Sequence, residues 1–117
     1  MQKLTEKERS DIPEPSGVTI GALRIEALPW GKARGLGQNG GYIAAYDTTN
    51  GSEQWILKVY AVEYDTRKED DKQDIFITEL KLSGDGQTLN VTNEERKHFV
   101  VKLSDRSIMG KEPDAVP

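Results

Sequence analysis

Cysteine is absent from this chain of 117 residues, and histidine occurs once, at position 98. Without thiols the chain has no disulfide, no thiolate metal ligand and no cysteine nucleophile. His98 is the one candidate for an imidazole base, and no serine lies in a Gly-x-Ser-x-Gly elbow. We therefore expect a non-enzymatic protein without a cofactor, with His98 as a surface or edge residue at the start of a strand.

Basic clusters and long apolar runs are also lacking. The net charge is −4 and no basic run is denser than Arg96-Lys97, so the electrostatic footprint of a nucleic-acid-binding protein is missing. No apolar run approaches the ~20 residues of a membrane span. The first eight residues contain no hydrophobic signal core. These absences predict a cytoplasmic protein that binds neither nucleic acid nor a membrane.

The length of the chain suits one domain. Most of its Leu, Ile, Val and Phe residues lie between Val18 and Ile108, with polar stretches on both sides. We therefore predict a single β-domain over 18–109. A flexible N-terminal tail is expected over 1–17, and a flexible C-terminal tail over 110–117.

Apolar and polar residues alternate in short segments bounded by turn residues, which is typical of strands. No stretch of ten residues has a helical period. The segments number about six: 18–27, 42–47, 55–64, 75–82, 88–92 and 98–103. A phase change at Gly21 predicts a β-bulge, and 55–64 is apolar on both faces, which predicts a central strand. The expected fold is all-β: a small antiparallel meander that closes as a barrel or a two-layer sandwich.

The sharpest local pattern is a hairpin at residues 45–55. Gly51 supplies the positive φ of a tight turn, and the side chains of Asp47 and Asn50 can bond the turn's own backbone. Trp55 then opens the return strand with a large apolar surface. The pattern predicts a buried Trp55, and its replacement by Ala is expected to cost roughly 3 to 5 kcal/mol.

Within this hairpin the order Ala45-x-Asp47-x-x-Asn50-Gly51-x-x-x-Trp55, preceded by Gly41-Tyr42-Ile43, resembles the tryptophan-docking blade motif of quinoprotein (pyrroloquinoline-quinone dehydrogenase-like) β-propellers. Asn50 stands where that family usually has threonine. The resemblance covers residues 41–55 and implies a packing role for Trp55, with no quinone-binding or catalytic residue. Blades take ~40 to 45 residues each, so a closed propeller exceeds this chain.

A glycine-rich stretch spans 31–41, with five glycines in eleven residues. Its sequence Gly35-Leu36-Gly37-Gln38-Asn39-Gly40 matches G-x-G-x-x-G, but a dinucleotide site requires a strand before these glycines and a helix after them. Here a strand follows. We expect an irregular, mobile loop that becomes ordered when a partner binds.

An acidic stretch, Asp65 to Asp74, lacks the Asp-x-Asp-x-Asp-Gly order of a calcium loop. We expect a solvated loop without a metal ion.

The leading hypothesis is a macromolecule-binding protein, an accessory or immunity-type inhibitor of a bacterial cell, with an unidentified protein partner. The candidate surface combines aromatic and basic side chains with flexible glycines: Trp30, Lys32, Arg34, Gly35, Gly37, Gly40 and Tyr42. The alternative is a small-ligand or carbohydrate-binding β-barrel, or a weak hydrolase using carboxylates such as Glu63 and Glu79. A concave site lined by Trp30, Tyr42, Tyr46 or Tyr60 favours a ligand, and a flat aromatic patch favours a protein.

Overall fold

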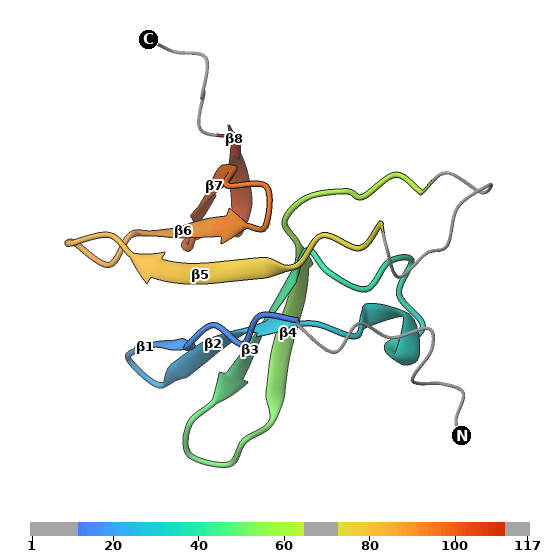
Figure 1. Cartoon of the computed structure of the whole chain (residues 1–117). Helices are drawn as coiled ribbons and strands as arrows, with labels where there is room; N and C mark the ends of the chain where they lie inside the picture. The colour runs from blue at the N-terminus through green and yellow to red at the C-terminus, as the bar shows by residue number, and fades with distance from the viewer. Residues whose placement is uncertain (1–11, 65–72, 112–117) are drawn as a thin grey trace, which may run out of the picture.

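The computed structural model describes residues 12–64 and 73–111. In this part of the chain there are two four-stranded antiparallel sheets, with strand orders β1-β2-β3-β4 and β5-β6-β7-β8 (Figure 1). The strands are β1 (Val18–Ile20), β2 (Leu23–Leu28), β3 (Tyr42–Asp47), β4 (Glu53–Lys58), β5 (Ile77–Leu82), β6 (Thr88–Asn93), β7 (His98–Lys102) and β8 (Ser107–Lys111), with a 3-10 helix η2 (Gly31–Arg34). The described residues form no helix that is long and apolar enough to cross a membrane.

The all-β prediction is confirmed, whereas the expected number of strands is wrong. Eight strands form rather than six, and no closed barrel exists in the described residues because no strand of one sheet pairs with a strand of the other. The segment 18–27 is two strands, because Gly21 takes φ +59° and reverses the chain instead of bulging it. The strand β8 extends to Lys111, inside the stretch predicted as a tail. Residues 1–11 and 112–117 of the predicted tails lie outside the described residues.

The inner faces of the two sheets share one hydrophobic core. In the first sheet, cross-strand neighbours place Ile25 beside Ala45, and Ile43 beside Leu57. In the second sheet, Leu89 pairs with Val101 in the same way. Because side chains alternate between faces along a strand, these apolar residues point toward the opposite sheet and leave Arg24, Glu26 and other polar groups outside.

Trp55 lies on this inner face but is half-buried, which corrects the prediction of full burial. The predicted central strand 55–64 is the edge strand β4, which ends at Lys58. An edge strand has a neighbour on one side only, so the indole, opposite Ala45 in the register, remains partly exposed. The guanidinium of Arg106 lies 5.3 Å from the ring centroid.

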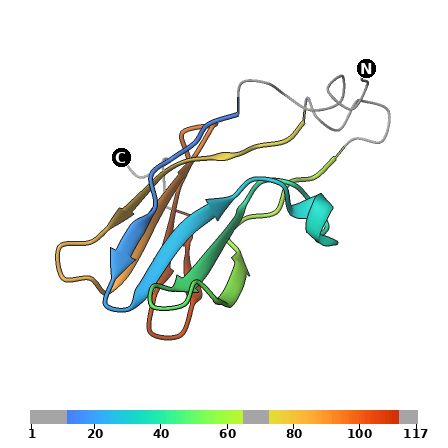
Figure 2. The same cartoon turned by 90° about the horizontal axis from the view of Figure 1, so that it is seen from below.

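The sheets come closest where β5 lies beside β1 and β2. Figures 1 and 2 both place the β1–β2 and β5–β6 turns at one end of the molecule, with η2 at the opposite end. On the other side of the core, β4 and β8 are the edge strands, and Trp55 and Arg106 bridge them. This second side is where the sheets leave space between them.

Three hairpin turns contain an aspartate that accepts hydrogen bonds from the turn. The Asp85 carboxylate accepts from the Gln87 amide at 3.0 Å and the Ser83 hydroxyl at 2.6 Å. In the same way, the Asp47 carboxylate accepts from the amide and hydroxyl of Thr49, and the Asp105 carboxylate accepts from those of Ser107. These bonds, the side-chain hydroxyl first, lower the pKa of all three carboxyl groups, because they favour the ionised form.

The burial pattern predicts that truncation of Leu89 lowers the free energy of unfolding more than truncation of Trp55 does. Leu89→Ala removes a fully buried side chain and is expected to destabilise the fold by about 2 to 5 kcal/mol. Trp55→Ala is expected to lower the free energy of unfolding by about 2 kcal/mol, below the range for fully buried aromatics. The reason is that part of the indole is exposed to solvent and part contacts Arg106, a flexible surface side chain. Urea unfolding measures both values, and a larger loss for Trp55→Ala than for Leu89→Ala would contradict this interpretation of the core.

The turn aspartates predict an acid-dependent loss of stability. Their contribution is fully present above the ordinary carboxyl pKa of 3.8 and is lost as the pH falls through the lowered pKa values of the folded protein. The triple variant D47N/D85N/D105N should therefore show a shallower fall in unfolding free energy from about pH 4 to about pH 2. Glu79→Gln, at an exposed carboxylate without a hydrogen-bond partner in the described chain, is the control and should follow the parent. Equal acid slopes in all three proteins would refute the assignment.

Candidate functional site

The glycine-rich stretch 31–41 forms a compact loop that covers the outer face of β3. The Gly31 amide donates to the Asn39 carbonyl at 3.1 Å, which closes the loop on itself. A β-carbon on Gly31 would lie 2.6 Å from Cε2 of Tyr42, so glycine permits the loop to rest on that ring. The expected irregular loop therefore includes the 3-10 helix η2 and a packed inner side.

Gln38 is the buried polar centre of this loop, with 4% of its surface exposed. Its Nε2 donates to the carbonyls of Gly40 at 2.7 Å and Tyr60 at 2.8 Å, and its Oε1 accepts from the Val62 amide at 2.8 Å. Because these partners are backbone groups without a strand neighbour, the carboxamide replaces a sheet ladder for the chain that leaves β4. Sequence reasoning missed Gln38, since a glutamine among glycines gives no sign of burial.

Asn39 and Asp74 make a second connection under the loop. Asn39 Nδ2 donates to Asp74 Oδ2 at 3.1 Å, and the Tyr64 hydroxyl donates to Asp74 Oδ1. Lys32 Nζ lies 4.3 Å from the centroid of the Tyr64 ring, a cation–π contact. Asp74 is thus buried, contrary to the solvated loop expected for the acidic stretch, whose residues 65–72 lie outside the described residues.

Arg34 ties the loop to the edge of the first sheet. One guanidinium nitrogen, Nη2, lies 2.9 and 3.0 Å from the two carboxylate oxygens of Glu53. The hydrogen bond to Glu53 and its negative charge raise the pKa of Arg34. Both side chains are partly exposed, so this ion pair contributes little to stability and mainly orients the loop.

The seven residues of the predicted binding surface differ in their exposure to solvent. Lys32, Arg34, Gly35 and Gly37 are exposed on the loop, and Trp30 is half-buried beside it. Gly40 and Tyr42 are buried, and Tyr42 exposes 6% of its surface under the loop. Trp30 and Gly40 line the hollow described next, whereas Tyr42 lies under the loop, so the seven residues do not form one face.

That hollow, the Trp30 groove, has a volume of about 380 Å³. Its lining has three parts: the run 12–17, β2 with the two residues after it, and residues before β3 and at the start of β5. The last two parts are Arg24, Glu26, Ala27, Leu28, Pro29 and Trp30, and Gly40, Gly41, Phe76 and Ile77. Trp30 and Phe76 meet edge to face, with ring centroids 5.6 Å apart. The lining thus combines one run of the chain, 12–17, with β2 and the segment after it, and it contains an aromatic pair.

Beyond Ile25, the outer edge of β2 faces residues 12–17 across this groove and has no paired strand among the described residues. The pairing of β1 with β2 ends at Val18 and Ile25, so in the described chain no strand pairs with β2 beyond that point on this side. On its other side β2 remains paired with β3 to Leu28. Unpaired backbone amides and carbonyls at a sheet edge can pair with another extended chain.

A second hollow, the seam cavity, lies between the sheets on the β4 and β8 side and has a volume of about 420 Å³. Its lining is Val59, Tyr60, Ala61, Ile75, Asn93, Glu95, Lys97, Phe99 and Ile108. Tyr60 stacks on Phe99 with centroids 4.9 Å apart, and its hydroxyl donates to the Ile75 carbonyl at 2.7 Å. Burial raises the pKa of Tyr60, so the hydroxyl remains a donor at neutral pH.

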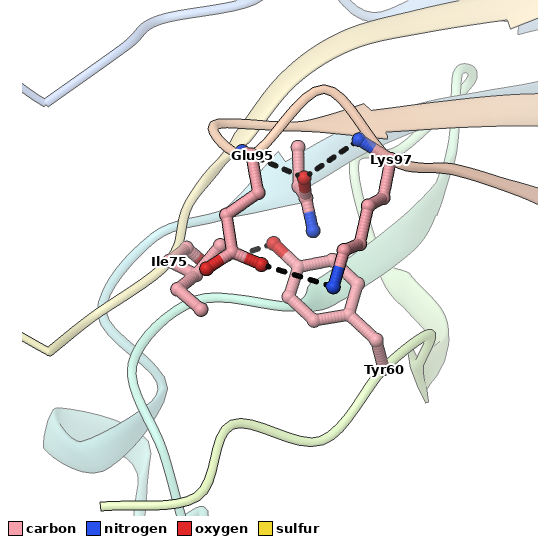
Figure 3. Close-up of polar contacts among 5 residues, drawn as sticks. Tyr60, Ile75, Glu95 and Lys97 are labelled. Atoms are coloured by element: carbon pink, nitrogen blue, oxygen red, sulfur yellow. Dashed lines mark hydrogen bonds and ion pairs between the residues drawn. The ribbon is translucent and has the colours of Figure 1, made fainter. Parts of the chain in front are cut away.

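Charged side chains border the seam cavity at the β6–β7 turn. Figure 3 shows Glu95 and Lys97 reaching from this turn toward Tyr60. Lys97 Nζ lies 3.4 Å from Glu95 Oε1, and both side chains are about half exposed. Tyr60 was a candidate cavity residue from the sequence, whereas Asn93, Glu95 and Lys97 were not, because their position depends on how the second sheet lies against the first.

The remaining candidates for chemistry stay apart from these hollows. His98 Nδ1 lies 2.9 Å from Thr92 Oγ1 and 3.2 Å from Asn90 Oδ1, on the polar face of the second sheet. Glu63 and Glu79 are both exposed. Within the described residues, no group of three or more His, Cys, Asp or Glu side chains is placed to hold a metal ion.

Comparison with known proteins does not assign the chain to a family. It matches no protein-family model and no curated protein.

Two glycines of the loop give a matched test of its packing. A β-carbon on Gly40 would lie 2.3 Å from the Ile75 carbonyl oxygen, so Gly40→Ala should destabilise the protein by about 1 to 3 kcal/mol. Gly37 has no atom within 4 Å of the corresponding position, and Gly37→Ala should be nearly neutral, within about 0.5 kcal/mol. Urea unfolding compares them. Equal effects would mean that the loop is not packed against Ile75, as the mobile-loop hypothesis expects.

Proposed function

We propose that this protein is a non-enzymatic binding domain that holds an extended segment of a partner protein in the Trp30 groove. The proposal rests on the lining of the groove, which combines the run 12–17 with residues of β2 and the segment after it, including the half-buried Trp30. An extended peptide advances about 3.3 Å per residue, which matches the rise of β2 along one side of the groove.

The chemistry of the lining supports a peptide. Leu28, Trp30 and Phe76 provide an apolar floor for a side chain, and Trp is among the residue types that dominate binding energy. Arg24 and Glu26 form an exposed ion pair at 2.6 Å on the rim, where charges of both signs set orientation more than affinity.

The edge of β2 beyond Ile25, which faces residues 12–17 across the groove, adds a source of backbone hydrogen bonds. A partner segment beside Glu26 to Leu28 would extend the first sheet where β1 stops. Strand addition of this kind obtains affinity from the main chain and specificity from pockets for alternate side chains.

The role that follows is that of an accessory or immunity-type inhibitor protein, which acts by binding its partner and catalyses no reaction. A bacterial cytoplasm is the setting we propose. The absence of cysteine and the single histidine support binding over catalysis. The resemblance of the β3–β4 hairpin to a quinoprotein blade concerns the packing of Trp55 alone, and we propose no quinone site.

A peptide library tests the proposed function. We expect selection of random peptides on the purified protein to enrich sequences with apolar residues at alternate positions. Their binding should shift the backbone amide resonances of residues 12–17 and 24–30. Trp30→Ala should weaken binding about tenfold or more, as loss of a central aromatic does in other interfaces.

Met109→Ala is the matched control, because Met109 is an apolar side chain that is 61% exposed and lies outside the groove. This variant should bind the selected peptides as the parent does. Thermal unfolding of each variant verifies that it is folded. The proposal is refuted if no peptide is enriched, or if enriched peptides bind the Trp30→Ala variant with unchanged affinity.

A further inference from the structure

The seam cavity contains a buried polar group with unused hydrogen-bonding capacity. Asn93 is 3% exposed, and its Oδ1 accepts from the backbone amides of Glu95 at 2.8 Å and Lys97 at 3.1 Å. Since only an oxygen can accept from two N–H donors, the orientation of the carboxamide is determined. Its Nδ2 has no acceptor within the described part of the chain.

A buried amide nitrogen without an acceptor is uncommon, because its desolvation is not offset. Asn93 lines the seam cavity, so an acceptor atom in this cavity would satisfy the nitrogen. The structure thus contains a donor that is held in position by the turn and is available to a ligand.

Two further groups of the same turn have the complementary charges. The ammonium of Lys97 and the carboxylate of Glu95 face each other at 3.4 Å over the region of Tyr60 (Figure 3). An ion pair this exposed is weak, so a ligand carrying both charges can replace it without leaving either side chain unpaired. A ligand with one charge would satisfy one side chain and be repelled by the other.

The rest of the cavity is apolar. Val59, Ile75, Phe99 and Ile108 line it together with the Tyr60 ring. Its volume of about 420 Å³ lies within the range of small-molecule sites, at the lower end. A ligand that fits has a short zwitterionic head and a compact apolar body.

We propose that the seam cavity binds a free α-amino acid with a large apolar side chain. Its carboxylate accepts from Asn93 Nδ2 and Lys97 Nζ, its ammonium contacts Glu95, and its side chain lies against the apolar lining. A peptide does not fit this scheme, because its internal residues lack the paired charges. The site is separate from the Trp30 groove and does not depend on the proposed peptide binding.

Titration of the labelled full-length protein with L-phenylalanine, followed by amide resonances, tests the proposal. Saturable shifts are expected at residues 59–61 and 93–99. Phenethylamine lacks the carboxylate and 3-phenylpropionate lacks the ammonium, and each should bind about tenfold more weakly or worse. If 3-phenylpropionate binds as tightly as L-phenylalanine, the site takes simple carboxylates and the amino-acid assignment is wrong.

Asn93→Asp separates the ligand role from the structural one. Aspartate keeps an oxygen for the amides of Glu95 and Lys97 and replaces the Nδ2 donor by a second oxygen, so L-phenylalanine binding should fall about tenfold or more. The Lys97→Gln variant should lose affinity for L-phenylalanine to a similar extent, and it tests the site if the Asn93→Asp variant does not fold. Lys81→Gln, at an exposed lysine outside the cavity, should bind as the parent does. The proposal is overturned if no saturable shift occurs up to the solubility limit, or if Lys97→Gln leaves the affinity unchanged.

Discussion

The side-chain carboxamide of Gln38 is the constraint on which the arrangement of this molecule depends. Two acceptors and one donor of the backbone, at Gly40, Tyr60 and Val62, are satisfied by this one buried group. The bonded residues belong to the loop over the first sheet and to the chain that leaves β4 for the second sheet. Without Gln38, three buried backbone groups would be left without partners, at a cost of about 1 to 3 kcal/mol each.

Both proposed sites depend on this connection. Gly40 and Gly41, beside Gln38, line the Trp30 groove, and Tyr60, bonded to Gln38, lines the seam cavity. Contacts continue the link on each side: the Gly41 carbonyl accepts from the Val59 amide at 2.7 Å, and the Tyr60 hydroxyl donates to Ile75. Both hollows have lining residues in the chain between β4 and β5, Phe76 in the groove and Tyr60 in the cavity, so a substitution at Gln38 should disturb both together.

Parts of each site were accessible from the sequence. Trp30 stood out as an aromatic beside a glycine-rich stretch, and it lines a groove. Tyr42, predicted at the surface, is buried, because Gly31 lets the loop rest on its ring. Asn93 gave no signal, since an asparagine before a turn usually bonds the turn backbone, as its Oδ1 does here. Its unused Nδ2 is visible only when the opposite sheet is in place.

The all-β class and most strand positions were predictable from the sequence, because alternation, glycine and turn aspartates act within a few residues of the chain. The β3–β4 hairpin was also predictable, with Asp47, Asn50 and Gly51 bonding the turn as expected. Three features were found in the structure and not predicted. Gly21 reverses the chain, β4 is an edge strand with Trp55 half-buried, and the sheets leave a cavity at Asn93. These features depend on which strands become neighbours and on how two sheets pack, and contacts between distant residues have no signature in local periodicity.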